Sequence, residues 1–306
     1  MSLDRIVIGT DFSGPSLEAT EWAVKRLAPG AAFVLVHVVS MAEPPSFLRG
    51  RLPSIETMRD DARIGATHRL AELRRSLGTP RVETEVRVGR TDEELHAVAE
   101  ARRADLIVVG RHGERPGIWR RLGSTAENLA RAGRTPVLLA TGLHDQAPRR
   151  VLAALDDSPA TASVAAWARS VAVRHDAAVV AMHVVNTSVP TYLLAAVGAA
   201  PGALGVPPAA GDAEHEVERA MWVRDTDQWL ERIVGRGLPP GRVTSETAFG
   251  APAAEILAAA ERHQADVVVM GTRGAGAVRR VLLGSVACEV LRNARCAVLV
   301  VPPPAA

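Results

Sequence analysis

The sequence predicts two tandem α/β domains, each a doubly wound parallel sheet with helices on both faces. Short apolar runs rich in Val and Ile alternate along the chain with longer segments of helical periodicity. Near-continuous apolar strands of this kind are typical of a parallel sheet buried on both faces. The chain also contains an internal repeat. Residues 5–13 (RIVIGTDFS) match 150–158 (RVLAALDDS), and residues 104–110 (ADLIVVG) match 265–271 (ADVVVMG).

The repeat sets the predicted domain boundaries at residues 1–141 and 149–304, joined by the linker TGLHDQAPR. The first half is predicted to contain strands at 5–10, 32–38, 82–88, 105–109 and 136–140 and helices at about 15–28, 55–77, 91–102 and 124–132. The second half is predicted to repeat the strands at 150–155, 178–184, 243–249, 266–270 and 297–301. Ser13 or Gly14 is suited to cap the first helix before Pro15, and Ser158 its counterpart before Pro159.

Composition excludes several classes of protein. The charge balance is 36 − 34 = +2 and aromatic residues make up 3%, which disfavours a nucleic-acid-binding surface. Lys25 is the single lysine, so the chain has no lysine-containing P-loop. The nine histidines show no metal-binding spacing. The N-terminus has no signal-peptide pattern, and two cysteines that do not form a C-x-x-C pair, Cys288 and Cys296, fit a cytoplasmic protein.

A glycine motif with the spacing G-x2-G-x9-G-S follows the fourth strand of each half. Its members are Gly110, Gly113, Gly123 and Ser124, and then Gly271, Gly274, Gly284 and Ser285. A glycine turn at the carboxyl edge of a parallel sheet, followed by a helix N-terminus, offers backbone N–H groups to a phosphate. Each glycine alone would be interpreted as an ordinary loop residue, but the repetition at identical spacing favours a phosphate-binding site. The serine hydroxyl could cap its helix or bind a phosphate oxygen.

The motif and the sequence around it resemble the universal stress protein family, whose ATP-binding members carry G-x2-G-x9-G-[ST]. The resemblance includes the opening strand ending in Asp-x-Ser, the HVV second strand and the ADLIVVG fourth strand. It implies a five-stranded parallel sheet in the order 3-2-1-4-5, with ATP at the edge between strands 1 and 4. The implied nucleotide contacts are Gly9, Thr10, Asp11, Val39, Gly110, Arg111, Gly113, Gly123, Ser124 and Thr125, and then Ala154, Leu155, Asp156, Val185, Gly271, Arg273, Gly274, Gly276, Gly284, Ser285 and Val286.

Some positions leave alternatives open. Asp11 and Asp156 could cap the following turn or could meet the nucleotide through Mg²⁺ or a ribose hydroxyl. The motif arginines read equally well as phosphate ligands or as a solvated loop; these are Arg111, Arg115, Arg120, Arg121, Arg273, Arg279 and Arg280. His37 and His183 read as core or as structure next to the site. Glu114 and Pro116 interrupt the first motif, so if only one site binds nucleotide we expect the second.

The resemblance implies a nucleotide-dependent regulator of the stress response that binds ATP with Mg²⁺ and is not a committed enzyme. The alternatives are a slow ATPase or nucleotide-using enzyme, or an interaction module that no longer binds nucleotide. Family members pair through the last strand, so PVLLA (136–140) and AVLVV (297–301) are expected to join the halves as a pseudo-dimer, with further homodimerisation open. The loops at 40–54 and 187–213 read as lids or as variable connections.

Overall fold

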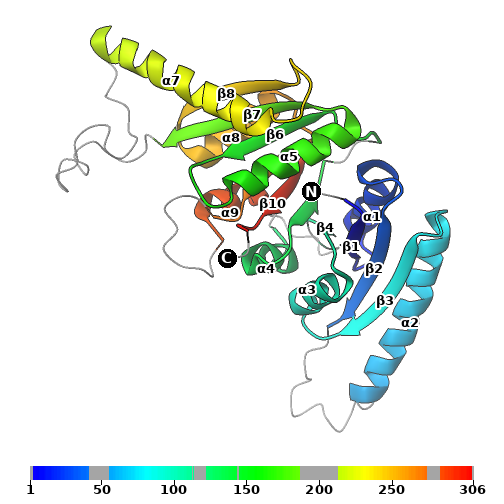
Figure 1. Cartoon of the computed structure of the whole chain (residues 1–306). Helices are drawn as coiled ribbons and strands as arrows, with labels where there is room; N and C mark the ends of the chain where they lie inside the picture. Colours follow the sequence, from blue (N-terminus) through cyan, green and yellow to red (C-terminus); the bar gives the residue numbers. More distant parts are fainter. Residues whose placement is uncertain are drawn as a thin grey trace, which may run out of the picture. The chain divides into compact units, whose positions relative to one another are not determined.

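The chain folds as two compact units, residues 1–147 and 148–306, each of which is described by itself (Figure 1). The computed structural model describes residues 3–40, 55–111, 113, 122–142, 145–186, 213–273 and 283–304. The loops at 40–54 and 187–213, which we considered as lids or variable connections, lie outside the described residues except for residues 40 and 213. Within the described part, no helix is long and apolar enough to cross a membrane.

The first unit contains a five-stranded parallel sheet in the predicted order. Its strands run β3-β2-β1-β4-β5 across the sheet, and each neighbouring pair is parallel. The predicted fold class is therefore confirmed, and the predicted strand ends agree with the observed ones to within one residue. The strands are β1 (Arg5–Gly9), β2 (Ala32–Val39), β3 (Val82–Val88), β4 (Leu106–Gly110) and β5 (Val137–Ala140).

Helices cover both faces of this sheet. On one face α1 packs on β4, and α2 packs on β2 and β3; on the other, α3 packs on β1 and β2 and also contacts α4 (Figure 1). The predicted helix at 15–28 is instead an α-helix followed by one wider π-helical turn, η1, which no feature of the sequence predicts. The helices are α1 (Gly14–Trp22), η1 (Ala23–Leu27), α2 (Ile55–Ser76), α3 (Thr91–Arg102) and α4 (Ser124–Ala132).

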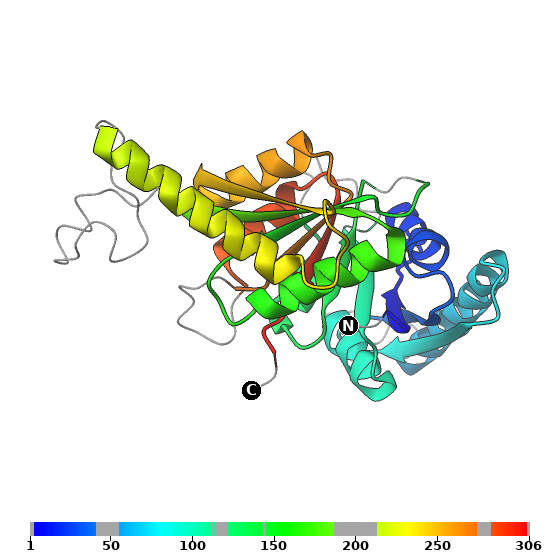
Figure 2. The same cartoon turned by 45° about the horizontal axis from the view of Figure 1, so that its top comes forward.

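The second unit repeats this arrangement. Its strands run β8-β7-β6-β9-β10, again with parallel neighbours. Figure 2 shows α5 and α7 on one face of this sheet and α8 on the other. The elements are β6 (Arg150–Leu155), α5 (Thr161–His175), β7 (Ala178–Asn186), α7 (Ala213–Val234), β8 (Val243–Gly250), α8 (Pro252–Arg262), β9 (Val267–Gly271), α9 (Ser285–Asn293) and β10 (Ala297–Val301).

The first helix of each half begins differently. Ser13 caps α1 as predicted, because its hydroxyl accepts a hydrogen bond from Ser16 N–H. The prediction that Ser158 caps the counterpart before Pro159 is wrong, since α5 begins only at Thr161. The reason is a tight turn: Ser158 Oγ accepts from Ala160 N–H at 3.3 Å, and the Ser158 carbonyl accepts from Thr161 N–H at 3.1 Å. The serine therefore serves the turn and not the helix.

An aspartate directly before the fourth strand of each half fastens the first strand. Asp105 Oδ2 accepts hydrogen bonds from the N–H groups of Asp4 and Arg5, at 2.9 and 3.0 Å. Asp266 Oδ2 accepts from Arg149 and Arg150 in the same way, at 2.7 and 2.8 Å. The aspartate of the repeated ADLIVVG motif is therefore structural.

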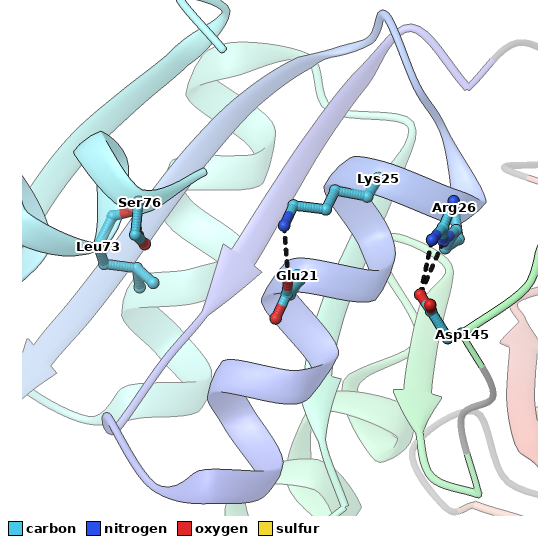
Figure 3. Close-up of polar contacts among 6 residues, drawn as sticks. All are labelled: Glu21, Lys25, Arg26, Leu73, Ser76 and Asp145. Atoms are coloured by element: carbon cyan, nitrogen blue, oxygen red, sulfur yellow. Dashed lines mark hydrogen bonds and ion pairs between the residues drawn. The ribbon is translucent and has the colours of Figure 1, made fainter. Parts of the chain in front are cut away.

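The chain after β5 is anchored to the first unit. Arg26, in η1, donates through Nε and Nη2 to Asp145 Oδ1, at 3.1 and 2.6 Å (Figure 3). Trp22 Nε1 donates to the Gln146 carbonyl at 3.2 Å. Trp22 belongs to α1 and Arg26 to η1, so these two elements together hold the segment that leads into the second unit.

Candidate functional site

The carboxyl ends of the first and fourth strands meet at one edge of each sheet. In the first unit Gly9 is paired with Val109, so Asp11 and Gly110 leave neighbouring strands at the same edge. In the second unit Ala154 is paired with Met270, which places Asp156 and Gly271 at the corresponding edge. The chain reverses its direction of winding between these strands, and open α/β sheets bind their ligands at such a switch point.

Asp11 is held in place by the residues that follow it. Its Oδ1 accepts hydrogen bonds from Ser13 N–H at 3.0 Å and from Ser13 Oγ at 2.5 Å. Burial alone would raise the pKa of Asp11, but the hydrogen bonds from Ser13 and Ser16 outweigh it and lower the pKa below its usual value. The side chain is therefore an oriented carboxylate at neutral pH.

Gly113, the second glycine of the first motif, lies against this carboxylate. A Cβ atom placed on Gly113 would stand 2.5 Å from Asp11 Oδ2, so a side chain here would displace the carboxylate from its present position. Glycine is therefore favoured here because the backbone approaches the carboxylate closely. The structure thus brings together the aspartate after β1 and the glycine turn after β4, two parts of the sequence about a hundred residues apart.

The base of the glycine loop is closed in the same way in both halves. Gly123 N–H donates to the Arg111 carbonyl at 3.0 Å, and Gly284 N–H donates to the Thr272 carbonyl at 2.9 Å. Gly123 and Gly284 are the N-cap residues of α4 and α9, without a side-chain cap. Ser124 and Ser285 are consequently the first helical residues and not the caps; both are exposed, and Thr125 and Val286 behind them are half-buried.

Other motif glycines are explained by packing. A Cβ atom on Gly110 would lie 3.1 Å from Pro15 C and Ser16 N, at the start of α1. One on Gly271 would lie 3.1 Å from Ala160 Cβ. Gly9 faces Leu95 of α3 in the same manner, at 2.8 Å. These glycines let helices approach the strand ends; among the described motif glycines, none has a positive φ.

The second strands end beside the same edge. Val39 and Val185 are buried, and the Val39 carbonyl accepts a hydrogen bond from Gly89 N–H at 3.2 Å. Two residues before them, His37 Nδ1 lies 2.8 Å from the Thr10 carbonyl and His183 Nδ1 lies 2.9 Å from the Leu155 carbonyl. Both histidines therefore brace the chain next to the aspartates.

Two threonines lie at these edges: Thr10 was among the expected nucleotide contacts, whereas Thr272 was missed by the sequence analysis. Thr10 Oγ1 lies 3.0 Å from Ser16 Oγ and accepts from Phe12 N–H at 3.0 Å, so this threonine orders the turn. Thr272 is 4% exposed, and in the described part of the chain its Oγ1 has no hydrogen-bond partner. A buried hydroxyl without a partner is costly, so this atom suits a ligand oxygen. Its position directly after Gly271 was the available signal.

The remaining predicted positions divide into two groups. Arg111 is 9% exposed, so a solvated loop is the wrong interpretation for this arginine; Arg273 is half-buried. The rest lie outside the described residues: Gly274, Gly276, Glu114, Arg115, Pro116, Arg120, Arg121, Arg279 and Arg280. Within the described residues, no group of three His, Cys, Asp or Glu side chains could hold a metal ion.

A comparison with protein-family models decides the family. The model of the universal stress protein family matches residues 2–141 and, a second time, residues 148–302. The chain belongs to the universal stress protein family. A universal stress protein of Mycolicibacterium smegmatis is 28% identical over 312 residues, which cover 97% of each chain. One of Methanocaldococcus jannaschii is 49% identical over 63 residues, 21% of this chain and 37% of that relative's length.

A solved structure agrees with the fold of this tandem universal stress protein. A universal stress protein from Archaeoglobus fulgidus superimposes with a TM-score of 0.67 at 19% identity, over 99% of this chain and 97% of the other. A universal stress protein solved in complex with cAMP matches 45% of this chain and 97% of its own, at 25% identity and a TM-score of 0.32.

A buried histidine distinguishes the first half of this universal stress protein from the second. His96, in α3, is 3% exposed, and its Nε2 lies 3.3 Å from the Leu129 carbonyl of α4. Leu257 stands at the equivalent position of α8 (96 + 161). Burial lowers the pKa of His96, and the charge of Arg134 lowers this pKa further. The hydrogen bond to the Leu129 carbonyl and the negative charges of Glu100 and Asp92 oppose the change. In the described part of the chain, its Nδ1 has no partner.

We expect the protein to lose stability as the pH falls below about 6.5, the usual pKa of histidine, until the lowered pKa of His96 is reached. In this window the unfolded chain binds a proton that the folded one does not. The free energy of unfolding therefore falls by at most about 1.4 kcal/mol per pH unit. Urea unfolding at several pH values gives the dependence of the free energy of unfolding on pH. This dependence should be weaker in His96→Leu and unchanged in His68→Leu, at an exposed position of α2. An unchanged dependence in His96→Leu would contradict this account.

Proposed function

We propose that this tandem universal stress protein binds ATP with Mg²⁺ at the switch point of each half and acts as a nucleotide-dependent regulator of the stress response. The observation that carries the proposal is the convergence of Asp11 with Gly113 beside the helix start at Gly123. Backbone approach, an oriented carboxylate and a helix N-terminus are the parts that a nucleotide phosphate site needs. We propose no committed enzymatic role, although slow ATP hydrolysis is compatible with it.

The residues present fit the nucleotide and its cation. Gly113 keeps open a space that a Cβ atom would fill, and Asp11 Oδ2 faces it. We propose that Asp11 meets a ribose hydroxyl or the Mg²⁺ and that the N–H groups at the start of α4 bind phosphate. In the second half Asp156, the Thr272 hydroxyl and the start of α9 take these roles. Bound Mg²⁺ would neutralise phosphate charge next to the carboxylate.

The proposal includes the association of the halves. β5 and β10 are the last strands of their own sheets and have the apolar sequences VLLA and AVLVV. Apolar strand edges need to be covered, so we propose an intramolecular pseudo-dimer through these strands, with a homodimer of chains as the next level. On its cysteine usage we place the protein in the cytoplasm. Light scattering of the full chain with and without ATP measures the homodimer.

The nucleotide proposal is tested on the purified protein. We expect denaturation to release ATP that chromatography identifies, and calorimetric titration with ATP and Mg²⁺ to show one site in each half. Asp11→Ala and Asp156→Ala should each remove one site, while Asp60→Ala, at an exposed position of α2, should remove none. ADP and cAMP serve as competing nucleotides.

The outcomes separate the proposal from its rivals. No released nucleotide and no binding at millimolar ATP would overturn the proposal in favour of an interaction module. Sustained phosphate release that each aspartate variant reduces and the double variant abolishes would instead make the protein an ATPase. Binding that survives both variants would place the nucleotide elsewhere.

A further inference from the structure

The turn after β1 contains a residue in an unfavourable backbone conformation. Phe12 has a φ of 63°, in the left-handed region that side chains with a Cβ avoid. The residue is also 6% exposed, so the strain lies inside the molecule. Strained residues of this kind persist only where their surroundings hold them, and they concentrate at functional sites.

An aromatic and a charged neighbour both contact the Phe12 ring. Its ring stacks on His37 with the ring centroids 4.7 Å apart, and the Arg69 guanidinium carbon of α2 lies 4.1 Å from the Phe12 ring centroid. Stacked rings and a cation over a ring face are both attractive arrangements. His37 in turn is fixed by the contact of its Nδ1 with the Thr10 carbonyl. The cluster formed by His37, Phe12 and Arg69 therefore holds the turn.

This turn determines the position of Asp11. Because the chain bends at Phe12, Ser13 returns so that both its N–H and its hydroxyl donate to Asp11 Oδ1. The same geometry directs Asp11 Oδ2 towards Gly113. The carboxylate is thus oriented by the protein itself.

The second half builds the same turn differently. Asp157 stands where the first half has Phe12 (12 + 145), and none of the residues 155–161, all of which are described, has a positive φ. Ser158 N–H donates to Thr161 Oγ1 at 3.2 Å, where Ser13 N–H donates to the aspartate. His183 meets Trp229 edge-on at 6.1 Å. Neither the bend at Phe12 nor the cluster around its ring is repeated.

We propose that Phe12 is a positioning residue that orients Asp11 before the nucleotide arrives, so that the first half binds ATP more tightly than the second. The inference rests on the proposed function and reverses the expectation from the motifs, in which the second site was favoured. Its physical basis is preorganisation: a group already held in its binding geometry loses less conformational freedom when the ligand binds. In the second half the turn around Asp156 has neither the bend nor the stacked ring that holds this geometry in the first.

The affinities of the two halves can be measured separately in the full chain. Asp156→Ala leaves the first site and Asp11→Ala leaves the second, and each is titrated calorimetrically with ATP and Mg²⁺. We expect a Kd for the first half that is lower by about tenfold or more. Phe12→Leu in the Asp156→Ala background should raise this Kd by about tenfold, whereas Phe12→Tyr, which keeps the stacked ring, should restore it.

A matched control separates positioning from stability. Phe33 is likewise buried, at 2% exposed, but lies near the start of β2, at the opposite end of that strand from the site. We expect Phe33→Leu to lower the thermal midpoint without changing the Kd of the first half. If Phe12→Leu does not fold, the ratio of the two affinities with native Phe12 still tests the inference.

Equal affinities, or a Kd that Phe12→Leu leaves unchanged, would overturn the role of Phe12 while leaving the ATP sites intact. A tighter second site would also overturn it and would point to the Thr272 hydroxyl as the stronger determinant. Failure of the unsubstituted protein to bind ATP at either site would overturn the proposed function, and the inference with it.

Discussion

Asp105→Ala is expected to lower the free energy of unfolding by about 3 kcal/mol. The carboxylate accepts hydrogen bonds from the N–H groups of Asp4 and Arg5, and each such charge-assisted bond contributes about 1.5–3 kcal/mol. The side chain is half-buried, so we take the lower end of the sum of the two bonds. Removing it leaves two backbone donors at the start of β1, a central strand of its sheet, without their acceptor.

Urea unfolding measures this loss, and amide hydrogen exchange at Arg5 locates it. The corresponding change in the second half, Asp266→Ala, should act equally and should expose the amide of Arg150 instead. Asp60→Ala is the control, because its exposed ion pair with Arg63 contributes well under 1 kcal/mol. Slow exchange at Arg5 in Asp105→Ala would show that the strand start is held by other contacts.

Gly110→Ala is expected to lower the free energy of unfolding by about 2 kcal/mol, because overpacking at a rigid site costs about 1–3 kcal/mol. The new Cβ would approach Pro15 C and Ser16 N at 3.1 Å. Both atoms belong to the backbone at the start of α1, so they yield less easily than a flexible side chain. The start of the helix has to move away from β4, and the Asp11–Ser13 turn that precedes it moves as well.

A second glycine provides the contrast. Gly65 lies inside α2, where a Cβ atom would have no neighbour beyond its own helix within 4 Å. Gly65→Ala should therefore raise the free energy of unfolding by about 0.5–1 kcal/mol, since alanine favours the helix more than glycine does. Both variants are compared by urea unfolding, together with ATP titration for Gly110→Ala. If Gly110→Ala were as stable as the unsubstituted protein, the glycine would have to be explained by a ligand and not by helix packing.

The fold could be predicted from the sequence because its pattern is dictated locally. Strands such as LIVVG of β4 are apolar throughout, and a strand buried on both faces requires that pattern. The repeat strengthened the prediction, since each element had a counterpart in the other half. The π-helical turn at Ala23–Leu27 could not be foreseen, because nothing in AVKRL differs from an ordinary helical sequence.

The strand ends that the candidate residues follow could be predicted from the sequence, but the contacts among these residues could not. The spacing of the glycines pointed to the strand ends, yet it did not distinguish Gly113, which meets a carboxylate, from Gly110, which meets a helix. The Ser-Pro pair before α5 resembles a helix start, but Ser158 forms its hydrogen bond within a turn. These outcomes depend on tertiary contacts such as the stack of Phe12 on His37, which no local pattern encodes.

The anchoring of the segment after β5 has a consequence for dissecting the molecule. The Gln146 carbonyl is bound by Trp22 and the Arg149 N–H by Asp266, so only Ala147 and Pro148 lie between the two attachments. Proteases cut most readily at exposed, loosely held loops, and this junction has only two residues between its hydrogen-bonded ends. Cleavage between the halves is therefore expected to break one of these hydrogen bonds. A fragment that ends here would then be less stable than the same half in the intact chain.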